Sequence, residues 1–280
     1  MSNERQIEDW NGPLGQVWAD QQVLLDRITS PFGDAALAAA RAQPGERVID
    51  VGCGCGDSSL TLGRSVGEKG AVLGVDVSEP MLAVAARRAR DEGLAHVAFR
   101  HADAAVVRLE PDRDLIYSRF GVMFFDDPQA AFANIRRWLT PAGRIAFCCW
   151  RPPSENPYFY VPVGAARAAL DYDPPLMDPY APGPFAFADV ERLRGLMAAA
   201  GFAGFNADRF DTEVWVGADV EAAAETMTMF GPVARLIREV GEQSRPVAKA
   251  AVAKAFEQLA RPDGSVWLGG STWIVTARAA

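Results

Sequence analysis

A short glycine-rich segment, "VIDVGCGCGDSSL" at residues 48–60, constrains the fold of this chain most strongly. Its apolar first residues predict a buried strand. Three glycines, Gly52, Gly54 and Gly56, fall within the next five positions, and a helix-like segment begins near Ser58. A buried strand that turns through glycines directly into a helix is typical of an open α/β sheet, and ligands bind at the edge where such turns lie. The segment therefore predicts both a fold class and the place of a binding site.

The region from Glu46 to Cys149 alternates strand-like and helix-like segments. We predict strands at residues 47–51, 71–75, 96–100, 115–119 and 144–150, and helices near residues 58–66, 79–92 and 128–139. Ser78 before Glu79-Pro80 is a favourable helix cap, and residues 141–143 (Pro-Ala-Gly) are expected to form the turn before the fifth strand. This alternation predicts a parallel sheet with helices on its faces.

The composition changes after Trp150. Residues 151–184 are rich in proline and tyrosine and predict an irregular insertion with one short helix near residues 162–170. Farther on we predict helices at residues 189–200, 220–230, 233–240 and 246–259, and strands at residues 205–216 and 272–277.

Length and charge exclude several classes of protein. A chain of 280 residues with 49% hydrophobic content can bury one large core. The net charge of -8 and the scattered basic residues disfavour a nucleic-acid partner. The first thirty residues do not show the signal-peptide pattern of a basic segment followed by an apolar stretch. No apolar run reaches the roughly 18 residues of a membrane helix. We therefore expect a cytoplasmic protein with no membrane partner.

Metal binding is not expected. The four cysteines form two close pairs, Cys53/Cys55 and Cys148/Cys149, which fit neither a disulfide framework nor the usual zinc spacing. The chain has only two histidines, His96 and His101. We expect Cys148 and Cys149 to be core residues of the fifth strand.

The glycine turn itself allows several interpretations. A dinucleotide fingerprint would place its third glycine at position 57, which is Asp57 here, and no Gly-Lys-Ser/Thr follows to make a P-loop. A purely structural strand-to-helix turn also accounts for clustered glycines. Two later acidic residues favour ligand binding: Asp76 ends the second strand-like run, and Asp103 follows the third. Carboxylates at these strand ends are placed to accept hydrogen bonds from ribose hydroxyls and from a purine amine.

Residues 46–150 resemble the class I S-adenosylmethionine-dependent methyltransferases. The resemblance rests on "VIDVGCGCG", "GVDVSEPML", "HADA" and "DLIYSRFGVMFFDDP", in that order. The flanks "WNGPLGQVW" and "CCWRPPSENPYF" resemble those of bacterial small-molecule enzymes in the broad group of quinone-biosynthesis methyltransferases. The resemblance implies S-adenosyl-L-methionine as cofactor. It also implies a Rossmann-like, seven-stranded, mostly parallel sheet whose last strand is antiparallel.

The resemblance also implies roles for individual residues. Asp50 and the loop would hold the methionine part, Asp76 the ribose and Asp103 the adenine amine, while Ser118 and Arg119 would lie beside the sulfonium. The full set of expected cofactor-binding residues is Asp50, Gly52, Cys53, Gly54, Gly56, Asp76, Val77, Ala102, Asp103, Ala104, Ser118, Arg119 and Trp18. A helix that begins at Ser58 would direct its N–H groups towards the cofactor carboxylate.

We expect one methyltransferase domain, residues 1–280, with helical lid insertions. Residues 1–45 would form an N-terminal lid segment, residues 46–150 the cofactor-binding core, residues 151–184 an insertion after the fifth strand, and residues 217–264 a helical insertion between the last two strands. A lid suits methyl transfer, which gains chiefly from alignment and from exclusion of water. The expected lid holds many aromatic and methionine residues: Trp10, Trp18, Tyr158, Phe159, Tyr160, Tyr172, Met177, Tyr180, Met227, Met229 and Phe230.

This content suggests a small apolar or aromatic substrate, with Trp10, Arg119, Tyr158, Tyr160 and Tyr172 as candidate contacts, although the same side chains could simply pack the lid. Trp18 and Gln22 are spaced to share a helix face. Arg119 could instead form an ion pair with Asp126 or Asp127. We predict no dedicated catalytic base; His101, Glu155, Tyr158 and Tyr160 are weaker candidates.

The leading hypothesis is methyl transfer to oxygen, carbon or nitrogen of a small molecule. Three alternatives stay open: methylation of RNA or protein, a cofactor-binding protein without turnover, and a nicotinamide-dependent oxidoreductase. The Asn/Asp-Pro-Pro-Tyr/Phe motif of amino-methylating nucleic-acid enzymes is absent after the fourth strand, where "SRFGVM" stands. A Tyr-x-x-x-Lys pair typical of one oxidoreductase class is absent too. The acceptor and the oligomeric state do not follow from the sequence.

Overall fold

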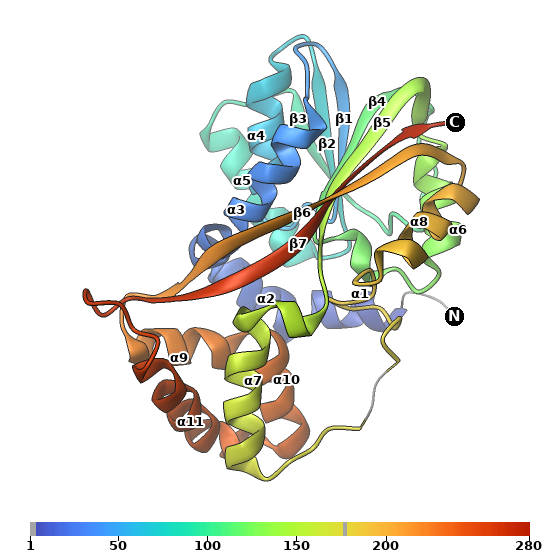
Figure 1. Cartoon of the computed structure of the whole chain (residues 1–280). Helices are drawn as coiled ribbons and strands as arrows, with labels where there is room; N and C mark the ends of the chain where they lie inside the picture. Colours follow the sequence, from blue (N-terminus) through green and yellow to red (C-terminus); the bar gives the residue numbers. More distant parts are fainter. Residues whose placement is uncertain (1–3, 176–177) are drawn as a thin grey trace. The chain divides into compact units, whose positions relative to one another are not determined.

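The computed structural model describes residues 4–175 and 178–280 (Figure 1). Met177, one of the expected lid residues, lies outside the described residues. The chain divides into two compact units. Unit 1 comprises Met1–Arg151, Pro179–Phe210 and Thr272–Ala280, and unit 2 comprises Pro152–Asp178 and Asp211–Ser271.

The strands form one seven-stranded sheet. They are β1 (Arg47–Val51), β2 (Ala71–Asp76), β3 (Val97–His101), β4 (Arg113–Arg119), β5 (Leu139–Trp150), β6 (Phe202–Gly217) and β7 (Val266–Ala279), in the spatial order β3-β2-β1-β4-β5-β7-β6. β1 to β5 pair in parallel, and β7 pairs antiparallel to β5 from Arg144↔Arg278 to Trp150↔Thr272. The predicted Rossmann-like sheet with an antiparallel last strand is confirmed.

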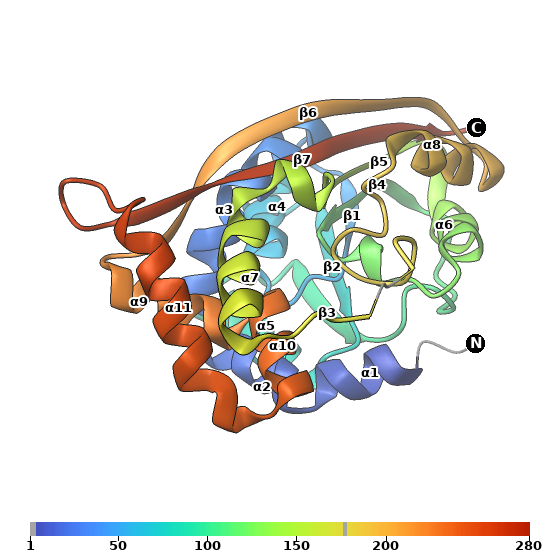
Figure 2. The same ribbon diagram turned by 60° about the horizontal axis from the view of Figure 1, so that its bottom comes forward.

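Helices cover both faces of the sheet in unit 1. Figures 1 and 2 show α3 (Gln22–Ala40), α4 (Asp57–Val66) and α5 (Glu79–Asp91) on one side of β1 to β5, and α6 (Pro128–Arg136) and α8 (Val190–Ala199) on the other. Two shorter helices, α1 (Glu4–Asn11) and α2 (Pro13–Asp20), precede α3. The central strands are apolar on both faces, as buried parallel strands require; Ile49, Ile116 and Phe147 have no exposed surface.

Unit 2 has a helical core of its own. It contains α7 (Pro157–Leu170), α9 (Val220–Met229), α10 (Gly231–Val240) and α11 (Arg245–Glu257), with the short 3-10 helices η2 (Pro153–Glu155) and η3 (Glu242–Ser244). Apolar side chains of these helices bury one another, among them Ala166, Ala223, Ile237, Val252 and Phe256. The predicted insertions at residues 151–184 and 217–264 overlap the two stretches of this unit.

Three local predictions are wrong. β5 begins at Leu139, not at Arg144; the expected turn at residues 141–143 lies inside this strand, where the ladder is irregular between Arg113↔Leu139 and Leu115↔Arg144. Residues 157–170 form one helix that continues through Pro162, although we expected an irregular stretch with a short helix beginning there. Gln21 separates α2 from α3, so Trp18 and Gln22 lie on different helices and do not share a face.

Among the described residues, no helix combines the length and the apolar character needed to cross a membrane.

Candidate functional site

The glycine turn after β1 has the backbone that only glycine adopts easily. Gly52, Gly54 and Gly56 have φ of 70°, 52° and 86°. A Cβ at Gly52 would lie 2.6 Å from the Cα of Gly121, and one at Gly56 would lie 2.9 Å from the Cβ of Ala85. For a Cβ at Gly54, the nearest heavy atom would be the Sδ of Met81 at 3.8 Å. The first and third glycines therefore allow close packing, whereas the second leaves backbone accessible to a ligand.

Asp50 ties the end of β1 to the first turn of α4. Its side chain has no exposed surface, and its Oδ2 accepts hydrogen bonds from the hydroxyls of Ser58 and Ser59, both at 2.6 Å. Its Oδ1 has no hydrogen-bond partner among the described residues. Burial raises the pKa of Asp50 to about 6, against the lowering effect of the two serines. One carboxylate oxygen is thus buried without a donor from the described part of the chain, which fits a ligand group that donates a hydrogen bond or carries positive charge.

Asp76 lies at the end of β2 and is joined directly to the glycine turn. Its Oδ2 accepts a hydrogen bond from the N–H of Gly54 at 2.8 Å, and its Oδ1 accepts one from the N–H of Ser78 at 2.9 Å. The residue is 8% exposed, and burial raises the pKa of its carboxyl group. Each oxygen keeps a further lone pair, so Asp76 can accept hydrogen bonds from two hydroxyl groups of a ligand.

The "HADA" loop follows β3. The Oδ1 of Asp103 accepts a hydrogen bond from the N–H of Ala105 at 2.8 Å, and Asn134 of α6 donates to the carbonyl of Ala104 at 3.0 Å. Ala102 donates its N–H to the carbonyl of Asp76 at 2.9 Å. The predicted adenine loop is therefore attached to the predicted ribose residue. Sequence reasoning missed Asn134, because it lies 30 residues from the carbonyl that it binds.

The end of β4 packs against the glycine turn. Ser118 is fully buried and donates its hydroxyl to the carbonyl of Val51 at 2.7 Å. Arg119 pairs with Asp57 at 2.8 Å and with Asp26 at 3.4 Å, and no ion pair joins it to Asp126 or Asp127, which we expected as its alternative partners. The two aspartates raise the pKa of Arg119 against the opposing effect of burial.

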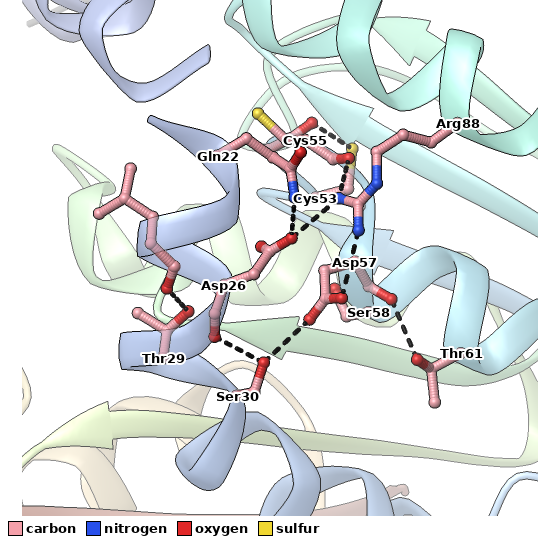
Figure 3. A network of polar contacts seen from close by, with 12 residues as sticks. Gln22, Asp26, Thr29, Ser30, Cys53, Cys55, Asp57, Ser58, Thr61 and Arg88 are labelled. Atoms are coloured by element: carbon pink, nitrogen blue, oxygen red, sulfur yellow. Dashed lines mark hydrogen bonds and ion pairs between the residues drawn. The ribbon is translucent and has the colours of Figure 1, made fainter. Parts of the chain in front are cut away.

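Arg88 of α5 completes a closed set of four charges, which we call the charge ring: Asp26, Asp57, Arg88 and Arg119. Arg88 lies 3.0 Å from Asp26 and 3.5 Å from Asp57, and it donates to the carbonyl of Cys55 at 2.9 Å (Figure 3). Each aspartate therefore contacts both arginines. The ring joins α3, α4, α5 and β4 around the glycine turn. Gln22 donates its side-chain amide to Asp26.

The N-terminal helices bind the segment that follows Asp76. Asn11 donates its amide to the carbonyl of Val77 at 2.6 Å and accepts the N–H of Glu79 at 3.0 Å. The hydroxyl of Ser78 donates to the carbonyl of Trp10 at 2.7 Å. Sequence reasoning missed Asn11, because nothing in the local pattern relates it to a segment more than 60 residues away.

Trp18 lies beside the glycine turn, where the thiol of Cys55 contacts its carbonyl oxygen at 3.9 Å. The Trp10 ring lies 5.3 Å from the Trp18 ring and 5.7 Å from the Phe124 ring. Phe124 belongs to η1 (Val122–Phe124), directly after β4. Phe124 was not among the predicted site residues.

The remaining candidates lie in different surroundings. Tyr158, Tyr160 and Tyr172 belong to unit 2: Tyr158 and Tyr172 pack on its core, and Tyr160 is 49% exposed. Burial raises the pKa of Tyr158. His101 has both ring nitrogens engaged, with the carbonyl of Val77 at 2.9 Å and with Glu79 at 3.2 Å.

These features define a class of protein. An open α/β sheet with a glycine turn after β1, and carboxylates at the ends of β1, β2 and β3, is a Rossmann-like nucleoside-binding architecture. The N-terminus of α4 adds N–H groups that suit a carboxylate.

Comparison with known proteins identifies the family. A family model described as "Methyltransferase domain" matches residues 48–143. Demethylmenaquinone methyltransferase of Thermus thermophilus is 32% identical over 201 residues, which cover 64% of this chain and 86% of that protein. An uncharacterized protein of Mycobacterium tuberculosis is 31% identical over 137 residues; the match spans 48% of each chain, about half of that relative's length.

Solved structures share the fold. A Bacillus subtilis protein aligns with a TM-score of 0.58 at 17% identity, covering 89% of this chain and 98% of that one. Phosphoethanolamine N-methyltransferase 2 of Haemonchus contortus, in complex with S-adenosyl-L-methionine, aligns with a TM-score of 0.59 at 17% identity, covering 100% of this chain and 60% of that one. The chain belongs to the class I S-adenosylmethionine-dependent methyltransferases, and S-adenosyl-L-methionine is its cofactor.

Proposed function

We propose that this protein transfers the methyl group of S-adenosylmethionine to a small apolar or aromatic molecule. The hydrogen bond from Gly54 N–H to Asp76 supports this proposal most directly, because it makes the glycine turn and the carboxylate at the end of β2 a single binding unit. The Oδ1 of Asp50, buried without a partner among the described residues, fits a cofactor that brings hydrogen-bond donors and positive charge.

In this proposal each part of the cofactor meets one strand end. Asp76 and Val77 hold the ribose, and Ala102, Asp103 and Ala104 hold the adenine. Asp50 and the turn, with Gly52, Cys53, Gly54 and Gly56, hold the methionine part. Ser118 and Arg119, the last residues of β4, line the side of the cofactor site that β4 forms. Arg119 acts through its pairs with Asp57 and Asp26, which fix the end of β4 against the turn.

The proposed mechanism depends on alignment and assigns no dedicated base: the acceptor loses its proton to solvent. When bound, S-adenosylmethionine supplies a methyl group activated by its positively charged sulfur. The residues of the chain hold the reacting groups in line and exclude water, which together lower the barrier without an acid or base. His101, the histidine nearest the site in sequence, already has both ring nitrogens engaged.

An aromatic pair in unit 1 supports an aromatic acceptor. Phe120, directly after β4, stacks on Trp150 at the end of β5 with a centroid distance of 4.5 Å and an interplanar angle of 8°. Phe120 has φ of 62°, a left-handed backbone that is strained for a bulky residue, and such strain clusters at active sites and ligand clamps. Because β4 and β5 are parallel, the pair lies at the ligand-binding edge of the sheet. The methylation of demethylmenaquinone, for which the Thermus relative is named, agrees with this acceptor class.

Tyr158, Tyr160 and Tyr172 remain proposed acceptor contacts from unit 2, and the insertions remain a proposed lid. Limited proteolysis tests the lid: S-adenosylmethionine should slow cleavage within residues 151–184. Identical cleavage with and without it would argue against cofactor-coupled closure.

The experiment that tests the proposed function follows the methyl group. The protein is incubated with methyl-deuterated S-adenosylmethionine and a metabolite extract, and products are analysed by mass spectrometry. We expect a small apolar product that carries the deuterated methyl group. Label in RNA or protein would contradict the small-molecule acceptor. Binding of the cofactor without any labelled product would favour a binding protein.

A further inference from the structure

Three aromatic side chains, which we call the aromatic cluster, meet between the N-terminal helices and β4: Trp10, Trp18 and Phe124. The Trp10 ring makes an interplanar angle of 84° with Trp18 and of 87° with Phe124. All three side chains are only partly buried. Edge-to-face contact is the ordinary packing of aromatic pairs, and here the rings also keep surface that a ligand can contact.

Each member of the aromatic cluster is attached to a different segment around the proposed cofactor site. The carbonyl of Trp10 is hydrogen-bonded to Ser78, two residues after Asp76. The carbonyl of Trp18 contacts the thiol of Cys55 within the glycine turn. Phe124 follows the end of β4, whose Gly121 packs against Gly52.

The covalent order of the cofactor relates these segments to the sulfonium. This step rests on the proposed function, in which Asp76 holds the ribose and the glycine turn holds the methionine part. The sulfonium sulfur joins those two parts, so it must lie between the end of β2 and the turn. Trp10 is attached near the end of β2 and Trp18 at the glycine turn. Phe124 approaches from the side of β4.

Aromatic faces attract cations, because the ring quadrupole places negative charge above and below the ring. Two buried carboxylates, Asp50 and Asp76, add negative charge at the ends of the neighbouring strands. The charge ring contributes none, because its two arginines balance its two aspartates. A cation is therefore the favoured occupant beside the aromatic cluster.

We propose that Trp10, Trp18 and Phe124 recognise the positively charged sulfur of S-adenosylmethionine and thereby distinguish it from S-adenosylhomocysteine, the neutral thioether product. The two molecules share the nucleoside and the amino-acid group, so the remaining contacts treat them alike. Discrimination at the sulfur favours binding of the methyl donor and release of the product after transfer.

Calorimetric titration of purified variants with each of the two molecules tests this proposal. Trp18→Leu keeps apolar bulk but removes the aromatic face, and Trp18→Phe keeps a face. In Trp18→Leu we expect the affinity for S-adenosylmethionine relative to S-adenosylhomocysteine to fall about 3- to 10-fold, the range of a cation–π contact. Trp18→Phe should retain most of the wild-type ratio.

Phe124→Leu provides a second variant in a short segment outside the N-terminal helices, in case Trp18→Leu unfolds them. Trp267→Leu, a partly buried tryptophan of unit 2, is the matched control and should leave the ratio unchanged. Equal losses of affinity for both molecules in Trp18→Leu and Phe124→Leu, or an unchanged ratio, would overturn the proposal. Failure of the wild-type protein to bind either molecule would instead contradict the proposed function.

Discussion

Gly121→Ala tests whether the end of β4 must approach the glycine turn as closely as the structure shows. A Cβ at Gly121 would lie 2.6 Å from the carbonyl oxygen of Val51 and 2.8 Å from the Cα of Gly52. Real Cβ atoms do not come so close to backbone, so either β4 or the turn must move. Gly121 has φ of -77°, which alanine adopts freely, so the effect of this substitution is purely steric.

The magnitude follows from overpacking against backbone atoms that cannot rotate away. Such an insertion costs about 1–3 kcal/mol of the free energy of unfolding. The same displacement moves Gly52, so the affinity for S-adenosylhomocysteine should fall as well. We expect a lower unfolding midpoint and at least a severalfold weaker dissociation constant, measured by denaturant titration and by calorimetry.

Gly195→Ala is the matched control. Gly195 lies within α8 of unit 1, and a Cβ there would meet no heavy atom within 4 Å. Replacing glycine by alanine inside a helix should stabilise the protein by about 0.5–1 kcal/mol and leave cofactor affinity unchanged. Unchanged stability and affinity in Gly121→Ala would refute the argument that contact with β4 shapes the turn.

Three further predictions concern charged residues. Asp76→Ala should weaken binding of S-adenosylmethionine and S-adenosylhomocysteine alike by tenfold or more, since hydrogen bonds to a charged group contribute about 1.5–3 kcal/mol each; equal affinity in calorimetry would move the ribose elsewhere. Because burial raises the pKa of Asp50 to about 6 from its ordinary 3.8, the folded protein holds this proton more tightly than the unfolded chain. The stability that the proton contributes is therefore present below about pH 4 and is lost as the pH rises from about 4 to about 6, and Asp50→Asn should flatten the pH dependence of unfolding in that range. A variant profile parallel to that of the wild type would contradict this. Arg119→Met leaves Asp26 and Asp57 with one arginine between them and should cost on the order of 3 kcal/mol; a double-mutant cycle with Asp26→Asn, measured by denaturant unfolding, should show positive coupling, and strict additivity would mean that the pair contributes nothing.

Local patterns predicted the core of the fold well. β1 has the predicted bounds, because its apolar residues and the glycines after it specify both the strand and its end. The βα alternation alone places Asp50, Asp76 and Asp103 at the ends of successive parallel strands. The helices α4 and α5 begin and end within one residue of the prediction, although Ser78 forms no side-chain cap at the start of α5, where Pro80 marks the chain.

Contacts between distant segments could not be predicted in the same way. The charge ring joins residues from four elements. Each of its ion pairs joins residues at least 31 positions apart in the sequence. Asn11 and Phe124 reach the site only because helices before β1 and after β4 meet in space. The break between α2 and α3 depends on the backbone of Gln21, a residue with no turn preference of its own.

Calorimetric titration of the wild-type protein with S-adenosylhomocysteine tests whether the glycine turn, Asp50 and Asp76 form a site for this nucleoside. We expect saturable binding with one molecule per chain, and at least tenfold weaker binding in Asp76→Ala with the fold intact. Absence of binding to both S-adenosylhomocysteine and S-adenosylmethionine, together with binding of NADH, would contradict it.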